Sequence, residues 1–184
     1  MIAYRHLWFV CLLVCFSCDN TKPSYSWEQV PVGDLYTIEL PDLLVPGYDM
    51  HDYAGLQYYS LEDNLYVLGI EDAKENLGEI KRKRLKLKGY FSFVEQTVLQ
   101  PVDTFKREST ETISLSDDSR ALIKDYYANS KLFGWNPLFY RIGVYENPDY
   151  FVQLVIWLPY EDHCEIMPML DSITQSIKFL PTLE

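Results

Sequence analysis

The chain has 184 residues, a formal net charge of −11 and a pI of about 4.7. A charge this negative excludes a protein that binds nucleic acid through a general electrostatic field, and it causes a bare anionic bilayer to repel the chain. Aromatic residues make up 15% of the chain and favour a β-rich interior, where aromatic rings pack well on pleated faces.

The first eighteen residues resemble a bacterial lipoprotein signal. Arg5 is part of a short positive region, and an apolar stretch over residues 7–16 follows it. That stretch is too short to span roughly 30 Å of hydrocarbon, so it predicts a cleaved signal and no permanent helix. Ser17 is small enough for a signal peptidase, and Cys18 follows it directly. We predict a signal peptide over residues 1–17 and lipidation at Cys18; the alternative is an ordinary signal peptide that merely contains cysteines.

Lipidation at Cys18 predicts an exported protein of a bacterial cell membrane or outer membrane, with its folded domain outside the cytoplasm. One acyl chain gives only marginal membrane binding, so stable anchoring requires the several chains of a lipoprotein cysteine, palmitate among them. Of the four cysteines, Cys11 and Cys15 leave with the signal. Cys164 then carries the thiol of the folded domain and is predicted to pack in its core. A single thiol gives no disulfide framework, so we expect an ordinary hydrophobic core.

The rest of the chain divides into a tether and one domain. Residues 19–26 are polar and without periodicity, which is typical of a linker. We predict a lipid-anchored tether over residues 18–33 and a single domain over residues 34–184.

The first half of that domain begins with segments that are predicted to form strands. Residues 35–41 predict a strand that stops at its proline. Residues 55–60 and 65–70 are β-type runs separated by a short turn that contains Asp63 and Asn64, which predicts a hairpin. A helical pattern of apolar residues then extends over about 73–99.

The second half predicts more strands and a short helix. Residues 104–115 predict one strand, and residues 138–145 and 150–158 predict a hairpin. Residues 120–130 are ambiguous, because their apolar side chains have helical spacing while their short length and flanking strands favour a sheet. Residues 161–173 predict an amphipathic helix that Pro168 kinks or begins. Strands with a long middle helix and a second helix near the C-terminus indicate an α+β sandwich.

Three segments in this order carry a family resemblance: residues 36–41, the hairpin of residues 139–145 and 150–157, and residues 173–179. They resemble the PsbP/Mog1-like fold family over residues 34–180. The resemblance implies a central antiparallel β-sheet with helices packed on its faces, an α/β/α sandwich, and it favours a strand at residues 120–128. Family members include photosystem accessory proteins, a Ran-binding import factor and exported bacterial proteins without assigned roles. The resemblance assigns no catalytic residue.

One segment is strongly basic in this acidic chain. It has six cations within eight residues: Lys81, Arg82, Lys83, Arg84, Lys86 and Lys88. We predict a dock for an acidic protein partner, with phosphate or lipid headgroups as other anions that such a segment attracts. The alternative is a solvated helix face whose long side chains cover apolar surface.

Two short segments place a histidine among carboxylates, namely residues 49–52 around His51 and residues 161–165 around His163. Imidazole and carboxylate are competent zinc ligands and general bases. Because no His-Glu-x-x-His or Cys-x-x-Cys spacing occurs, we predict no metal, no cofactor and no catalytic site. Cys164 follows His163 directly and is not expected to form a catalytic dyad with it, since neighbouring side chains on a helix point about 100° apart.

The remaining motifs have structural explanations. Turn chemistry accounts for the acidic pairs at residues 62–64 and 117–118, and Tyr58-Tyr59 and residues 135–137 are either exposed contact points or packing residues. No glycine-rich nucleotide motif and no Gly-x-Ser-x-Gly occurs. The sequence therefore favours a non-catalytic binding or scaffolding domain. The alternative is an envelope enzyme or metal-binding protein that uses His51 or His163.

Overall fold

The computed structural model describes residues 25–81, 85–114, 119–129 and 137–181. The sequence predictions on residues 1–24, 82–84, 117–118 and 135–136 lie outside this range. Cys18 is among them, as are three of the six cations of the basic segment.

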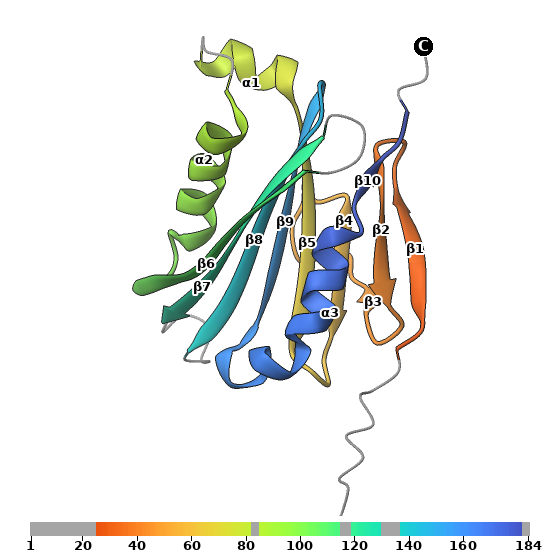
Figure 1. Ribbon diagram of the computed structural model, residues 1–184, viewed down its shortest axis with the longest axis vertical. Coiled ribbons are helices and arrows are strands. Elements are labelled where there is room, and N and C mark those ends of the chain that lie inside the picture. Colours follow the sequence, from red (N-terminus) through yellow and green to blue (C-terminus); the bar gives the residue numbers. More distant parts are fainter. Residues whose placement is uncertain (1–24, 82–84, 115–118, 130–136, 182–184) are drawn as a thin grey trace, which may run out of the picture.

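Two antiparallel sheets form the domain (Figure 1). The larger has the strand order β3-β4-β5-β9-β8-β7-β6, and the smaller has the order β1-β2-β10. The strands of the larger sheet are β3 (Val45–Pro46), β4 (Leu56–Ser60), β5 (Leu65–Ala73), β6 (Thr104–Ser114), β7 (Arg120–Asn129), β8 (Leu138–Glu146) and β9 (Tyr150–Pro159). Those of the smaller sheet are β1 (Trp27–Val32), β2 (Tyr36–Pro41) and β10 (Lys178–Phe179).

Both faces of the larger sheet are covered. α1 (Lys74–Lys81) and α2 (Leu87–Leu99) lie on one side of it, while α3 (His163–Gln175), which follows the short 3-10 helix η1 (Tyr160–Asp162), lies on the other side with the smaller sheet (Figure 1). Every residue of β8 is buried, because its alternate side chains enter two different cores. Ile142 and Val144 pack in the cluster under α2, whereas Phe139 and Tyr145 pack in the cluster under α3. The predicted α+β class, with a central antiparallel sheet between helices, is confirmed.

The ambiguous segment 120–130 is the strand β7, which pairs with β6 and β8. Ile123 faces the core under α3, and Leu122 and Tyr126 face the core under α2. Burial on both faces places apolar residues at neighbouring positions, so the period-two alternation of a half-exposed strand is lost. This explains the helical spacing of its apolar residues.

The single long helix predicted over residues 73–99 is wrong. Helix α1 ends at Lys81 and α2 begins at Leu87, and Lys86 between them has an extended backbone with φ −97° and ψ 162°. Cations at i and i+4 repel one another within a helix, which disfavours a helix through the basic segment. The break lets α2 place its own apolar side chains, Tyr90 and Phe91 among them, on the sheet.

The predicted start of the domain at residue 34 is too late. Residues 27–32, which were assigned to the tether, form β1 and pair with β2 from Trp27 opposite Pro41 to Val32 opposite Tyr36. Val32 is the one buried residue of β1, so the strand has almost no hydrophobic alternation to reveal it. Pro168 does not begin the last helix; it lies inside α3.

Candidate functional site

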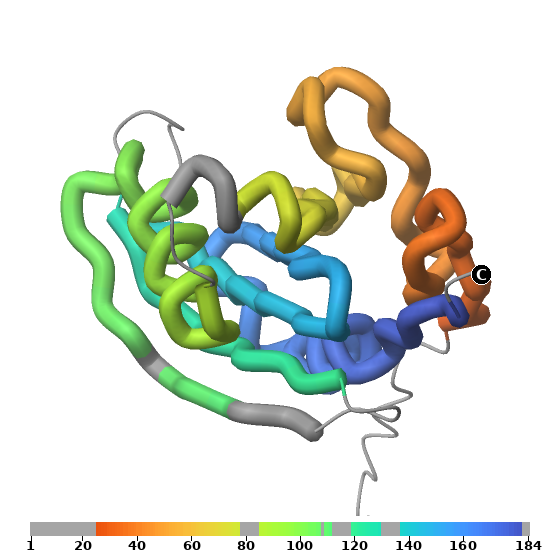
Figure 2. The backbone as a smooth tube through the Cα atoms, turned by 90° about the horizontal axis from the view of Figure 1, so that it is seen from above, coloured from red at the N-terminus to blue at the C-terminus, as the bar shows by residue number. Residues whose placement is uncertain are grey.

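Two tyrosines project from the connection between β3 and β4. Tyr48 is 83% exposed and Tyr53 is 82% exposed, more than any other large hydrophobic side chain of the described residues. They belong to residues 47–55, here called the tyrosine loop. Figure 2 shows the β3–β4 connection standing out from the rest of the backbone. The loop therefore presents its aromatic rings to the medium.

The side chain of Gln57 on β4 holds the backbone of the tyrosine loop in place. Its Oε1 accepts hydrogen bonds from the backbone N–H groups of Met50 and His51, at 2.8 and 3.1 Å. Its Nε2 donates to the carbonyl oxygens of His51 and Ala54, at 3.0 and 3.3 Å. In addition, His51 Nδ1 accepts the backbone N–H of Tyr53 at 3.2 Å. The Gln57 side chain thus holds the backbone of the loop in place, and His51 contributes a further hydrogen bond to the same structure.

A cavity of about 350 Å³ lies between the tyrosine loop and β1. It is lined by Val30, Pro31, Pro46, Gly47, Tyr48, Ala54, Gly55, Leu56, Gln57 and Tyr58. Pockets for small organic ligands have volumes of about 300–1,000 Å³, so this cavity is near the lower limit of that range and has room for one long side chain. Tyr58 is half-buried and packs against the core, so the packing interpretation of that residue holds.

A carboxylate lies directly behind this cavity. Glu71 on β5 accepts a hydrogen bond from the Tyr36 hydroxyl at 2.9 Å and another from the backbone N–H of Gly55. Burial raises the pKa of Glu71, although the hydrogen bonds from Tyr36 and Gly55 oppose this. A Cβ atom at position 55 would stand 2.6 Å from Glu71 Oε2, so only glycine lets the loop approach the carboxylate this closely.

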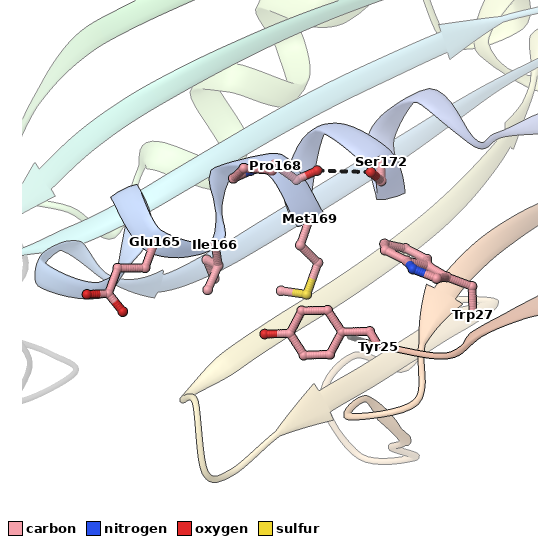
Figure 3. Close-up of a pocket in the computed structure, with 7 residues that line it drawn as sticks. All are labelled: Tyr25, Trp27, Glu165, Ile166, Pro168, Met169 and Ser172. Carbon is pink, nitrogen blue, oxygen red and sulfur yellow. Dashed lines mark hydrogen bonds between the residues drawn. The ribbon is translucent and has the colours of Figure 1, made fainter. Parts of the chain in front are cut away.

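A second cavity, of about 240 Å³, lies between the start of the described chain and α3 (Figure 3). It is lined by Tyr25, Trp27, Glu165, Ile166, Pro168, Met169 and Ser172. In Figure 3 the Met169 side chain points toward the ring of Tyr25, and Ser172 bonds back to the Pro168 carbonyl oxygen at 2.9 Å. The lining is mainly apolar and can hold an apolar side chain. It offers no set of converging polar groups among the residues that line it.

Cys164 and His163 differ from their predictions. Cys164 is exposed and does not pack in the core: it lies in the first turn of α3, whereas the buried residues of that helix begin at Met169. Its Sγ is 3.4 Å from His163 Nε2, so the two side chains touch after all. His163 begins α3 and folds back over η1: its ring stacks on Phe139 and Tyr160, and Nδ1 bonds to the Tyr160 carbonyl oxygen.

This contact does not make a nucleophile. Reactive thiolates occur in electropositive surroundings, whereas the neighbours in sequence here are Glu161, Asp162 and Glu165, all exposed carboxylates. His51 belongs to the tyrosine loop and bonds within it, whereas His163 packs against β8 and η1. The two histidines therefore have separate surroundings. Over the described part of the chain, no group of three or more His, Cys, Asp or Glu side chains could hold a metal ion.

The basic segment is described in part. Lys86 and Lys88 are exposed on either side of the start of α2. The end of α1 and the start of α2 lie at the upper end of the domain in Figure 1, whereas β1 begins at the lower end. Lys86 and Lys88 are thus at the end opposite to the beginning of the folded chain.

The sequence predictions missed the tyrosine loop and identified the turn at residues 62–64. In that turn the Ser60 hydroxyl donates to Asp63 Oδ2 at 2.7 Å, and Asn64 has a positive φ of 50°. The signal for the loop was the pair Gly47 and Gly55, which bracket two tyrosines. Within the described ranges, no helix is both long enough and apolar enough to cross a membrane.

Comparison with known proteins identifies the fold. No protein-family model matches the chain, and no curated protein matches it. Several solved structures resemble it. Cyanobacterial PsbP (CyanoP) from Synechocystis sp. PCC 6803 has a TM-score of 0.61 and 12% identity, and the match covers 89% of this chain and 97% of that one. The Ran-binding protein Mog1p from Saccharomyces cerevisiae has a TM-score of 0.58 and 12% identity, with 86% and 98% covered.

LpqN, involved in cell envelope biogenesis of Mycobacterium tuberculosis, has a TM-score of 0.60 and 13% identity, and the match covers 85% of this chain and 91% of that one. The chain therefore has the PsbP/Mog1-like fold, and the predicted resemblance is confirmed. At such low identities the similarity establishes the fold alone.

Proposed function

We propose that this chain is a lipid-anchored envelope protein whose domain binds an acidic protein partner and performs no catalysis. The sequence Ser17-Cys18 after an apolar stretch supports the anchor. A fold shared with a Ran-binding protein and with a protein of cell envelope biogenesis supports a binding role. The observation that carries the proposal is the position of Lys81 at the end of α1 and of Lys86 and Lys88 at the start of α2, at the end of the domain opposite to the start of β1 (Figure 1).

The proximal end of the domain is defined here as the end that holds residue 25 and the start of β1. The turn between β4 and β5 lies at this end as well (Figure 1), and the carboxylate of Asp63 in that turn joins burial in raising the pKa of Tyr25. From that turn β5 extends for nine residues, or about 30 Å, to Ala73, and α1 follows it. Lys81 ends α1, and Lys86 and Lys88 flank the start of α2, so these three cations are distant from the proximal end.

This separation decides which anion the basic segment can reach. Seven residues join Cys18 to Tyr25 and span at most about 25 Å, so an anchor at Cys18 would hold the proximal end near the bilayer. Charges on a surface are largely screened beyond about 10 Å at 0.1 M salt. Cations some 30 Å farther out therefore favour an acidic protein in the medium over the headgroups of the anchoring membrane.

The proximal end is itself acidic. It exposes several carboxylates around the turn of β4 and β5 and the start of α3: Glu62, Asp63, Glu161, Asp162 and Glu165. An anionic membrane surface repels such an end. The anchor and its short tether, and not electrostatic attraction, would therefore hold this end near the bilayer.

The anchor is tested by a Cys18→Ala variant in the bacterial host. Acylation should be lost, and the protein should leave the membrane fraction. A variant that remains membrane-bound and uncleaved would overturn the anchor.

The partner site is tested by charge reversal. Native membranes are cross-linked and the tagged lipoprotein is recovered, with Lys81, Arg82, Lys83 and Arg84 changed to Glu in one variant and Lys86 and Lys88 changed to Glu in another. Both variants should lose a cross-linked species that the wild type retains, and high salt should weaken its recovery. A Lys106→Glu/Lys178→Glu variant reverses exposed cations elsewhere and should keep it. Equal recovery from all variants, each still folded by circular dichroism, would leave the basic segment as a solvated surface.

A further inference from the structure

We propose that the tyrosine loop is a second docking surface, which binds a basic, Lys- or Arg-rich segment of a protein. It connects β3 to β4 and shares no residue with the basic segment that follows α1. The inference depends neither on the lipid anchor nor on the acidic partner proposed above.

The exposure of Tyr48 and Tyr53 is the first step of the argument. A tyrosine has a large apolar body, and rings that are more than four-fifths exposed leave that body in water. Exposed aromatic side chains gathered on one feature mark interaction sites, and tyrosine is among the residues enriched at the energetic centres of interfaces. The two rings belong to one loop and lie within six residues of each other in the sequence.

The second step is that the loop is already ordered. Gln57 makes four hydrogen bonds to the backbone of Met50, His51 and Ala54. A surface held in its binding conformation loses little conformational entropy when a partner arrives, which increases affinity. Gln57 acts as a positioning residue, since it holds the loop and need not touch the partner.

Charge selects the kind of partner. Residues 23–73 contain ten Asp and Glu and no Lys or Arg, so nearly all of the net charge of −11 arises in this stretch. Asp49 and Asp52 are exposed beside the two tyrosines in the loop itself. Such a field attracts cations, and the faces of tyrosine rings bind ammonium and guanidinium groups. A basic segment therefore complements both the charge and the rings.

The cavity beside the loop supplies a place for one long basic side chain. Its volume of about 350 Å³ is bounded by Tyr48, Tyr58 and Gly55, and the Glu71 carboxylate lies behind Gly55. The stem of a lysine or arginine can pack against the tyrosines while its charge approaches that carboxylate. We expect this side chain to be the one that the surface recognises best.

The test uses the purified full-length mature lipoprotein in a non-ionic detergent and a fluorescein-labelled octa-arginine peptide, with affinity read by fluorescence anisotropy. A Tyr48→Leu/Tyr53→Leu variant should bind roughly fivefold to thirtyfold more weakly, as expected for two exposed cation–π contacts. A Tyr48→Phe/Tyr53→Phe variant keeps the ring faces and should bind within about twofold of the wild type. Gln57→Ala should weaken binding while leaving the circular dichroism spectrum unchanged.

A matched pair separates the loop from the general field. Asp49→Asn/Asp52→Asn should weaken octa-arginine binding more than Asp34→Asn/Glu62→Gln, which removes the same charge from exposed positions outside the loop. Equal losses from the two pairs, or an unchanged affinity of the Leu variant, would overturn the proposal. Tighter binding of a neutral chitin oligosaccharide than of octa-arginine would also overturn it and identify a glycan surface. Because purified protein is used, these outcomes do not depend on whether Cys18 is acylated in the cell.

Discussion

Arg141 on β8 and Asp125 on β7 stand opposite each other and form a two-point ion pair inside the domain. Nε bonds to Oδ1 at 2.7 Å and Nη2 to Oδ2 at 3.0 Å, and both residues are 4% exposed. Arg141 Nη1 also bonds to Asp171 Oδ1 on α3 at 2.6 Å, and the Ser109 hydroxyl on β6 donates to Asp125 at 2.8 Å. These contacts connect three strands of the larger sheet to the helix that covers it.

Arg141→Met should lower the free energy of unfolding by about 3–5 kcal/mol, because it leaves the Asp125 carboxylate buried without its cation. Urea unfolding followed by tryptophan fluorescence measures this. Adding Asp125→Leu should recover much of the loss, since the uncompensated charge is removed. Asp171→Asn should cost less than about 1 kcal/mol, because half of its side chain is exposed. A double variant less stable than Arg141→Met would contradict this account.

Glu146 predicts a loss of stability on acidification. Burial alone would raise the pKa of Glu146, but hydrogen bonds and charge from Lys74 and Arg120 outweigh burial and lower it. A lowered pKa in the folded state contributes stability above the unfolded value of about 4.5, and this is lost as the pH falls through the folded value. Glu146→Gln should cost about 2 kcal/mol at pH 7 and progressively less below pH 4.5. A cost that does not change with pH would contradict the assignment.

Much of the fold could be predicted because many of its strands have a recognisable local sequence pattern. The hairpins of β4 with β5 and of β8 with β9 have turn-forming residues between apolar runs, and both were identified from sequence. The features that the sequence did not predict depend on contacts between segments that are distant in the sequence. β1 is held mainly by its pairing with β2, and the break between α1 and α2 follows from the need of α2 to lie on the sheet.

The candidate site was harder to predict than the fold. The role of the loop depends on Gln57 reaching back to Met50 and His51, a contact that no residue pattern states. Likewise, an arginine within an apolar strand signals a buried partner, but only the register of β7 against β8 identifies Asp125. The absence of Lys and Arg over residues 23–73 can be seen in the sequence. It indicates a binding surface only once the structure shows that exposed tyrosines lie in this stretch.

Two glycines should respond to alanine in opposite directions. Gly89 is exposed in α2, and a Cβ there would lie 3.5 Å from the nearest side-chain atom of Leu85. Gly89→Ala should therefore raise the free energy of unfolding by about 0.5–1 kcal/mol through helix propensity. At Gly143 a Cβ would lie 2.9 Å from the buried ring of Tyr145, so Gly143→Ala should cost about 1–3 kcal/mol. Urea midpoints that move in the same direction would contradict the packing described.

The exposure of Cys164 predicts that a thiol reagent can reach it in the folded protein. Mature lipoprotein with an acylated Cys18 should consume one equivalent of a thiol reagent such as Ellman's reagent, and without denaturant the reaction should be as complete as with it. Cys164→Ser should abolish the reaction and leave the urea midpoint nearly unchanged, because little apolar surface is lost. A thiol that reacts only after unfolding would show that Cys164 packs inside, and two reacting thiols would show that Cys18 is free.

Glu71 should give the opposite pH response to Glu146. Burial raises the pKa of Glu71, so between the unfolded value of about 4.5 and the higher folded value the native state binds more protons than the unfolded chain. Stability therefore falls as the pH rises through this window. Glu71→Gln removes the proton exchange and should be less stable than the wild type at pH 4.5, with the deficit shrinking toward pH 7, because the wild type alone must then hold a buried charge. Urea unfolding at several pH values in dilute protein measures the difference. A deficit that grows with pH would mean that the hydrogen bonds from Tyr36 and Gly55 stabilise the ionised carboxylate more than burial destabilises it.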